Sequence, residues 1–162
     1  MTISRKTNFY PTVITFKIVT PEATVYENNI DQATLPVVNG QVTILPGHRS
    51  YIAALKAGEL VLKKDGQEIH LATSGGFVEF NDNTLIVLAD TAERAEAIDL
   101  RRAEEARKRA EALKKEKVSM SELEYAKTAA LIEKEAARVR VAKKHRSKHG
   151  VHIEHTEQSD SM

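Results

Sequence analysis

The first 89 residues contain several short segments in which apolar and polar side chains alternate. Residues 13–19 are the clearest case, because Phe16 and Ile18 share one face of an extended chain. We expect strands at residues 13–19, 30–38, 41–45, 50–55, 59–63, 67–71, 77–80 and 84–88. Asp65 and Gly66 suit a type I′ hairpin, since both central residues of that turn need positive φ. Many short strands without an intervening helix predict an antiparallel sandwich or barrel.

The hydrophobic period changes near residue 90. Apolar residues then recur at intervals of three and four, the spacing of one helical face: Ala92, Ala95, Ala103, Ala106, Ala110 and Leu113. Asp90 offers a side-chain cap, with Glu93 three residues on, so we expect a helix from this point. Asp99 lies inside the apolar stripe, where an apolar residue is expected.

A second helix is expected from Ser121, because Glu124 completes a capping box. Its apolar face consists of Tyr125, Ala129, Ile132, Ala136 and Val139. A break in helicity at residues 117–120 makes the pair an antiparallel hairpin. The alanine seam buries little area, at about 0.8 kcal/mol per methylene-sized group, so the hairpin should be marginally stable alone.

These patterns predict an α+β chain, with an N-terminal antiparallel β-sandwich followed by a C-terminal antiparallel two-helix hairpin. The expected boundaries are residues 13–89 for the β-domain, 90–146 for the hairpin and 147–162 for a disordered polar tail.

Composition narrows the class of protein. Hydrophobic residues make up 41% of the chain and aromatic residues 5%, with no tryptophan, so the core must be aliphatic. The absence of cysteine excludes disulfides and thiolate metal sites and fits a reducing, cytosolic setting. No apolar run approaches the roughly 20 residues that span a bilayer, and we expect no secretory signal, so membrane association should occur only through partners.

Charge is unevenly distributed. Residues 1–89 contain 7 basic and 8 acidic residues, a net charge of −1, whereas residues 90–148 contain 17 and 12, a net charge of +5. The helical part is therefore the half expected to meet an anion. A nucleic-acid partner is not expected, because acids interrupt the basic residues and phosphate tracking needs a continuous basic face.

No catalytic motif is present: the sequence contains no P-loop, G-x-S-x-G, H-E-x-x-H or G-x-G-x-x-G pattern. Gly75 and Gly76 precede a strand, which indicates a bulge or a close backbone approach. His48 is expected to be a loop histidine at a contact surface. Four histidines near the C-terminus could together bind a metal: His145, His149, His152 and His155. Without a cysteine partner, a solvated tail is the simpler interpretation of this segment.

Acidic and basic residues on the two helices suggest a binding site. Asp99 and Arg102 lie one turn apart, and Arg109 follows two turns later on nearly the same side. Lys134 and Arg138 are neighbours on the second helix. In an antiparallel hairpin the two groups could face each other, although simple solvation of a charge-dense helix is the alternative.

Three stretches resemble the epsilon subunit of the F-type ATP synthase: residues 40–48 (G-Q-V-T-I-L-P-G-H), 74–79 (S-G-G-F-V-E), and 87–94 running into 98–103 (I-D-L-R-R-A). The resemblance covers residues 15–144. It implies a non-catalytic central-stalk subunit on the cytoplasmic face of a bacterial membrane, bound to the gamma subunit and the c-ring. It also implies a hairpin that folds against the sandwich or extends to the alpha and beta subunits and blocks ATP hydrolysis.

The resemblance further implies contact sites for those partners. Gln41 and His48 are the expected contacts with the c-ring or the gamma subunit. Gln41 replaces the usual glutamate and Thr43 a glycine, which removes an electrostatic part of the contact.

Members of that family that bind ATP carry an I/L-D-x-x-R-A motif, so the resemblance implies a regulatory ATP, not a required cofactor. The corresponding positions here are Glu93, Ile98, Asp99, Arg102, Ala103, Arg109, Lys134 and Arg138. Asp99 can accept from an adenine amine or a ribose hydroxyl, and guanidinium groups can bind phosphates bidentately. Lys134 offers only a point charge. The alternative is the same subunit without nucleotide affinity, its hairpin acting as a latch or a structural element.

Overall fold

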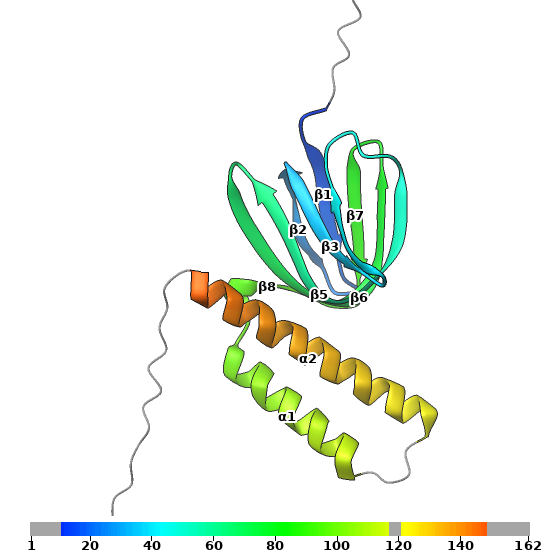
Figure 1. Cartoon of the computed structure of the whole chain (residues 1–162), viewed down its shortest axis with the longest axis vertical. Helices are drawn as coiled ribbons and strands as arrows, with labels where there is room; N and C mark the ends of the chain where they lie inside the picture. Colours follow the sequence, from blue (N-terminus) through cyan, green and yellow to red (C-terminus); the bar gives the residue numbers. More distant parts are fainter. Residues whose placement is uncertain (1–10, 117–120, 149–162) are drawn as a thin grey trace, which may run out of the picture.

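The computed structural model describes residues 11–116 and 121–148, and Figure 1 shows their arrangement. The strands are β1 (Ile14–Val19), β2 (Thr24–Ile30), β3 (Gln32–Val37), β4 (Gly40–Ile44), β5 (Tyr51–Lys64), β6 (Gln67–Asn81), β7 (Thr84–Ala89) and β8 (Ala92–Arg94). A 3-10 turn, η1 (Ala95–Ala97), leads into α1 (Leu100–Glu116) and α2 (Glu122–Lys148). α2 lies between α1 and the β-domain (Figure 1).

The strands pair in the order β2-β1-β7-β6-β5-β3-β4, and β8 pairs with β6. The predicted β-sandwich followed by a two-helix hairpin is confirmed. One detail of the fold class differs, because β1 pairs with β7 in parallel and the sheet is therefore mixed. The N-terminal strand lies between β2 and β7, and this placement has no local sequence signal.

The individual strands differ from the sequence expectation in two places, and one predicted turn is confirmed. Four expected short strands merge into the long antiparallel pair β5 and β6, which runs from Tyr51 opposite Phe80 to Lys64 opposite Gln67. Residues 24–30 form β2, which the sequence did not predict because most of its side chains are exposed. The tight turn at residues 65–66 is confirmed, with φ of 50° at Asp65 and 77° at Gly66.

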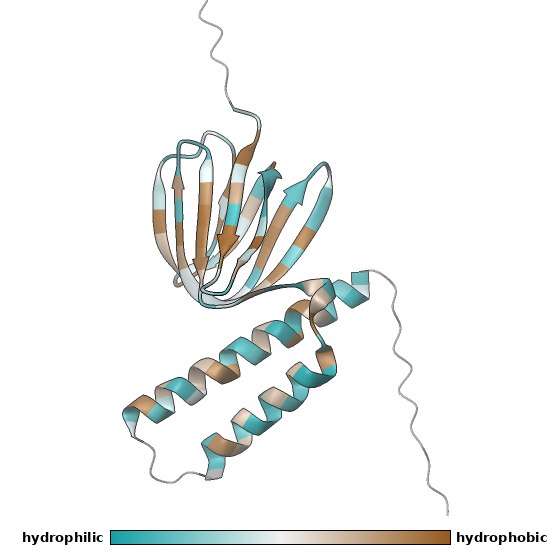
Figure 2. Cartoon of the chain, turned by 180° about the vertical axis from the view of Figure 1, so that it is seen from behind, coloured by the Kyte–Doolittle hydropathy of each residue, from teal (hydrophilic) through white to brown (hydrophobic). Residues whose placement is uncertain are grey.

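The sandwich interior is aliphatic, as composition predicted, apart from two phenylalanine rings. Its largest fully buried side chains are Phe16, Phe80, Ile14, Ile18, Ile30, Leu35, Ile44, Leu60, Leu62, Leu71, Leu85 and Val78. Apolar and polar positions alternate along the strands in Figure 2. This alternation places one face of each strand inside the sandwich.

The first helix begins later than expected. Residues 92–94 form β8 instead of the first helical turn, and α1 starts at Leu100. Asp99 caps this helix: its Oδ1 accepts a hydrogen bond from the Arg102 backbone N–H at 3.1 Å. The aspartate that interrupted the apolar stripe therefore lies just before the helix and satisfies one of its free N–H groups.

The start of the second helix agrees with prediction. The Ser121 backbone N–H donates to Glu124 Oε2 at 3.2 Å, and the Glu124 N–H donates to Ser121 Oγ at 3.3 Å, which forms the capping box. α2 continues to Lys148, so residues 147 and 148 belong to the helix and not to the tail that was expected from residue 147. The expected break at 117–120 and the rest of the tail, 149–162, lie outside the described residues.

The two helices share a small apolar cluster with the sheet, made of Ala72, Ala95, Ile98, Leu100, Ala103, Val139, Val141 and Ala142. No side chain between residues 121 and 131 is buried, whereas six α2 residues from Glu135 to Ala142 are. Only the second half of α2 is therefore packed against the domain. None of the described helices is long and apolar enough to cross a membrane.

Gly76 is a position where the fold requires glycine. Its φ is +128°, and a Cβ there would lie 2.0 Å from the Leu88 carbonyl oxygen on β7. We predict that Gly76→Ala lowers the free energy of unfolding by about 3 kcal/mol, measured by urea denaturation. Gly66→Ala is the matched control: its φ is +77° but no atom lies within 4 Å of the added Cβ. The control should cost about 1 kcal/mol, and equal losses would contradict the steric explanation.

Candidate functional site

The structure brings five of the eight predicted nucleotide-site residues to one hollow of about 360 Å³ beside the hairpin. These residues are Glu93, Asp99, Arg102, Arg109 and Arg138. They come from β8, from α1 and the residue that caps it, and from α2, so the hollow exists only while the hairpin is folded against the sheet.

Arg138 is the most strongly bound cation of this hollow. Its Nε donates to Glu93 Oε2 at 2.8 Å, and its Nη1 donates to Glu135 Oε2 at 2.8 Å. Burial of the guanidinium alone would lower the pKa of Arg138, but the hydrogen bonds to Glu93 and Glu135 outweigh it and raise that pKa above its ordinary value. Glu135 is 5% exposed and was not predicted as a site residue. Its position three residues before Arg138 was the available signal.

The two arginines of α1 are more accessible. Arg102 and Arg109 are both exposed, and Arg109 makes a long ion pair of 3.9 Å with Glu105 on its own helix. Arg102 makes no ion pair with any residue in the described ranges. Both guanidinium groups can therefore turn toward an anion at little cost.

The other three predicted residues lie elsewhere. Lys134 lines an adjoining hollow of about 280 Å³, which also includes Ser74 and Thr91. Glu93 and Arg138 line both hollows and stand between them. The remaining two, Ile98 and Ala103, are buried in the apolar cluster at the base of the hairpin and line neither hollow.

The two predicted contact residues on the sandwich lie at opposite ends of β4. Gln41 is its second residue, beside α2. His48 follows the other end, where its ring packs edge-on against Phe80 and Tyr51, with centroids 5.9 and 6.0 Å away. The structure does not bring this pair together.

An exposed apolar surface crosses the outer face of the sheet. Phe77 on β6 lies opposite Leu88 on β7 and Ala54 on β5, and Ile52 lies two residues from Ala54 on the same face. Ile52 is 74% exposed, Phe77 61% and Leu88 58%. Contiguous apolar side chains at this exposure indicate a docking surface. The sequence predicted these strands but did not identify their exposed face.

Comparison with known proteins assigns the chain to a family. A family model described as "ATP synthase, Delta/Epsilon chain, beta-sandwich domain" matches residues 13–95. The ATP synthase epsilon chain of Dehalococcoides mccartyi strain BAV1 is 44% identical over 80% of this chain and 91% of its own. The chain belongs to the ATP synthase epsilon family. It is thus a non-catalytic subunit of that complex, as the resemblance implied.

Further relatives agree with this assignment. The epsilon chains of Geobacter sulfurreducens and Herpetosiphon aurantiacus are 41% and 40% identical, over 78% and 83% of this chain and 91% and 98% of their own.

Solved structures support the fold of this epsilon-family chain. A chain in the Euglena gracilis mitochondrial ATP synthase, solved as OSCP/F1/c-ring in rotational state 1, aligns with a TM-score of 0.68 at 20% identity, covering 83% of this chain and 84% of that one. A chain in the Tetrahymena thermophila mitochondrial ATP synthase central stalk and c-ring aligns with a TM-score of 0.53 at 16% identity, covering 82% and 95%.

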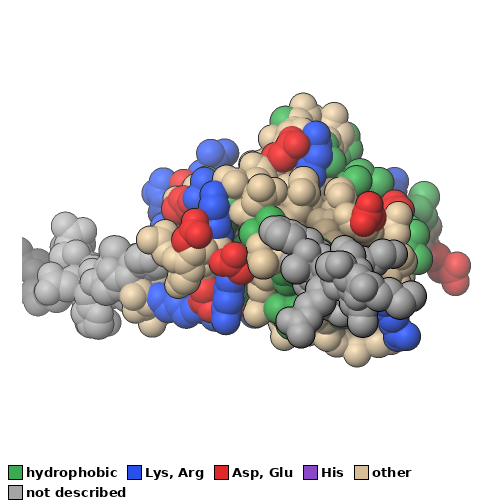
Figure 3. Space-filling view, turned by 90° about the horizontal axis from the view of Figure 1, so that it is seen from above, with side chains coloured by type: hydrophobic (Ala, Val, Ile, Leu, Met, Phe, Trp, Pro, Cys, Tyr) green, Lys and Arg blue, Asp and Glu red, His purple; other side chains and the backbone are tan. Residues whose placement is uncertain are grey.

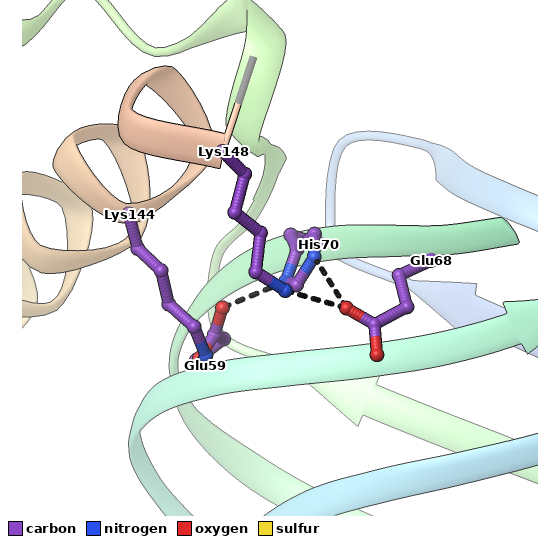
Figure 4. Close-up of polar contacts among 5 residues, drawn as sticks. All are labelled: Glu59, Glu68, His70, Lys144 and Lys148. Atoms are coloured by element: carbon purple, nitrogen blue, oxygen red, sulfur yellow. Dashed lines mark hydrogen bonds and ion pairs between the residues drawn. The ribbon is translucent and has the colours of Figure 1, made fainter. Parts of the chain in front are cut away.

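A cluster of charges fastens the end of α2 to the sandwich (Figure 4). Lys144 Nζ donates to Glu59 Oε2, and Lys148 Nζ donates to Glu68 Oε2, both at 2.6 Å. His70, 3% exposed, lies between the two carboxylates, with Nδ1 2.7 Å from Glu59 and Nε2 3.3 Å from Glu68. We call these five residues the latch cluster.

The sequence analysis did not identify the latch cluster, because its members look like ordinary exposed positions until α2 covers them. No group of three or more His, Asp or Glu side chains suited to a metal occurs within residues 11–116 and 121–148. His149, His152 and His155 lie outside those ranges, while the ring of His145 packs 6.4 Å from that of His70.

We predict that acid weakens the latch cluster. The hydrogen bond from Lys148 lowers the pKa of Glu68, burial partly opposes this, and the charges of Lys148, His70 and Lys63 lower it further. A carboxyl whose folded-state pKa is depressed stabilises the docked helix above its ordinary pKa, and this stabilisation is lost as pH falls through the lower value.

NMR amide shifts of Lys148 and its neighbours should therefore report a transition as pH falls from about 5 toward 3. Glu68→Gln should remove this transition and give the acid-like spectrum of α2's last turn already at neutral pH. Identical titration curves for the two proteins would show that Glu68 does not hold the helix.

Proposed function

We propose that this chain is a rotor subunit of a proton-translocating F-type ATP synthase whose C-terminal hairpin senses ATP and regulates ATP hydrolysis. The hollow at the hairpin carries this proposal. It gathers three arginines and three carboxylates, those of Glu93, Asp99 and Glu105, from separate elements of the chain.

The chemistry of the hollow suits a nucleotide. Arg102 and Arg109 can bind phosphate oxygens bidentately, which a lysine cannot do. Arg138 is already bound to Glu93 and Glu135, so a triphosphate would exchange for a carboxylate at that guanidinium. Asp99 Oδ1 is engaged in capping α1, so adenine or ribose contacts there would share this carboxylate with the helix.

Binding at this place would act on conformation. The arginines belong to α1 and α2 and Glu93 belongs to β8, so a bound nucleotide would connect all three elements. A ligand that binds only the folded hairpin stabilises it by RT ln(1 + [L]/Kd). Low ATP would release the helices toward the alpha and beta subunits, where they would block hydrolysis.

The partners proposed for the sandwich are the gamma subunit and the c-ring. The neighbouring structures from Euglena and Tetrahymena were solved in F1/c-ring and central-stalk/c-ring assemblies. The exposed surface of Ile52, Phe77 and Leu88 is the face we assign to gamma, because apolar side chains at the centre of an interface supply most of its binding energy. Gln41 and His48 are proposed as further contacts. The complex would hold the subunit at the cytoplasmic face of a bacterial membrane.

A second candidate is the same subunit with a hairpin that latches without a nucleotide. The observation in its favour is that Arg138 has two carboxylate partners already and needs no ligand for its charge. A nucleic-acid partner remains disfavoured, because acidic and basic side chains are interspersed on the face shown in Figure 3.

ATP sensing is tested with Arg102. Arg102→Ala should weaken ATP binding at least tenfold, about 1.4 kcal/mol, because it removes an unpaired guanidinium from the hollow. Isothermal titration of the full chain measures this. Arg101→Ala is the matched control, since Arg101 is exposed and lines neither hollow, and it should leave the affinity unchanged. Absence of binding to the unaltered chain at millimolar ATP would remove the sensing role and leave the subunit assignment intact.

The latching role is tested by truncation after Ala97. This end point keeps β8 paired with β6 and removes both α-helices, so the sandwich retains its described strands. ATP hydrolysis by the assembled complex should rise when the truncated subunit replaces the full chain. A rate equal to that of the full-length complex, with the subunit present in stoichiometric amount, would argue against an inhibitory hairpin.

A further inference from the structure

The largest of the three hollows described here lies between the sandwich and α2, at about 490 Å³. The turn from β3 to β4 forms one wall, with Pro36 and Gln41. The middle of β5 contributes residues 56–59, and α2 contributes Arg140, Val141 and Lys144. None of the residues that we assign to ATP lines it.

Arg140 differs from its neighbours on α2. The other lysines and arginines from residue 138 to the end of the helix each donate to a described partner: Arg138, Lys143, Lys144, Arg146 and Lys148. Arg140 makes no hydrogen bond or ion pair with any residue that the structure describes. Among the lysines and arginines of this stretch, Arg140 alone thus has a cationic group without a described partner, and it lies at the edge of the hollow.

Lys56 provides a second such charge from the opposite wall. It is exposed on β5 and, like Arg140, has no polar partner in residues 11–116 or 121–148. Lys144 is the third cation, and Glu59 is the single carboxylate. Glu59 is already shared between Lys144 and His70. Three cations against one carboxylate leave a local excess of two positive charges.

We propose that this hollow is a second anion site, which binds a phosphate-bearing ligand separately from the nucleotide site. A phosphate group carries close to two negative charges at neutral pH and matches the excess. The Arg140 guanidinium offers bidentate donors, Lys56 and Lys144 offer point charges, and the Gln41 amide can donate to a further oxygen. The exposure of Lys56 and Arg140 implies modest affinity that falls as salt rises.

The location gives the ligand a mechanical consequence. Lys56 belongs to the sandwich and Arg140 to α2, so one phosphate group would join the two across their interface. Lys144 also belongs to the latch cluster, which places the ligand directly beside the contacts that fasten the end of the helix. Occupancy would therefore favour the docked hairpin independently of ATP.

Pyrophosphate and anionic vesicles are the probes, since a soluble phosphate and a lipid headgroup carry the same chemistry. Titration calorimetry of the full chain in low-salt buffer should detect pyrophosphate binding, weakened at least tenfold in Arg140→Ala and several-fold in Lys56→Ala. Arg101→Ala should bind pyrophosphate like the unaltered chain. The Arg140-dependent binding should persist when Arg102→Ala has disabled the nucleotide hollow, which separates the two sites. Circular dichroism confirms that each variant is folded.

Cosedimentation with phosphatidylglycerol vesicles distinguishes the two sources. Arg140-dependent binding to vesicles that pyrophosphate displaces supports a headgroup, and Arg140-dependent binding of pyrophosphate without vesicle binding supports a soluble phosphate. Hydrogen exchange in residues 140–148 should slow on addition of pyrophosphate in the unaltered chain and not in Arg140→Ala. The proposal is overturned if pyrophosphate does not bind at about 20 mM. It is also overturned if Arg101→Ala weakens binding as much as Arg140→Ala.

Discussion

The half-buried guanidinium of Arg138 donates to one carboxylate on its own helix and to another on β8. A half-buried charge is costly to leave unpaired, so the packed arrangement depends on at least one of these two carboxylates. The short strand β8 pairs with β6, and through Glu93 it also receives α2. This set of hydrogen bonds joins the second helix to the strand that leads into α1, and two of its residues, Glu93 and Arg138, line both hairpin hollows.

The sandwich is recovered well from the sequence because its information is local. Alternation identifies most strands, and the turn at Asp65 and Gly66 and the capping box at Ser121 and Glu124 each depend on residues a few positions apart. The errors concern contacts that are distant in sequence. Residues 90–93 contain an acceptable helix cap, yet pairing with β6 makes residues 92–94 a strand. The parallel pairing of β1 with β7 is likewise invisible to local patterns.

The residues of the candidate site also fall into those that local sequence spacing identifies and those that only the tertiary structure brings together. The motif around Asp99 and Arg102 and the basic positions on α2 could be read from helical spacing, and the structure places five of those residues around one hollow. Glu135, His70 and the latch carboxylates were not found. Strand periodicity distinguishes an inner face from an outer one, but it cannot show that α2 covers part of the outer face and buries His70 there. Asp99 drew attention as a polar residue within an apolar helical stripe, but in the structure it is the N-cap and determines where α1 begins.

α2 has 27 residues, and at 1.5 Å per residue it forms a rod about 40 Å long. Its buried side chains all lie between Glu135 and Ala142, so the sheet holds only the second half of the helix, and the first half has α1 as its neighbour. A small rotation of the helix where it meets the sheet therefore produces a large displacement at its N-terminal end. Detaching α2 from the sheet requires breaking the ion pairs, hydrogen bonds and apolar contacts of its last four turns. The length of the helix therefore sets how far its N-terminal end moves, and the contacts of residues 135–142 with the rest of the domain determine whether it moves.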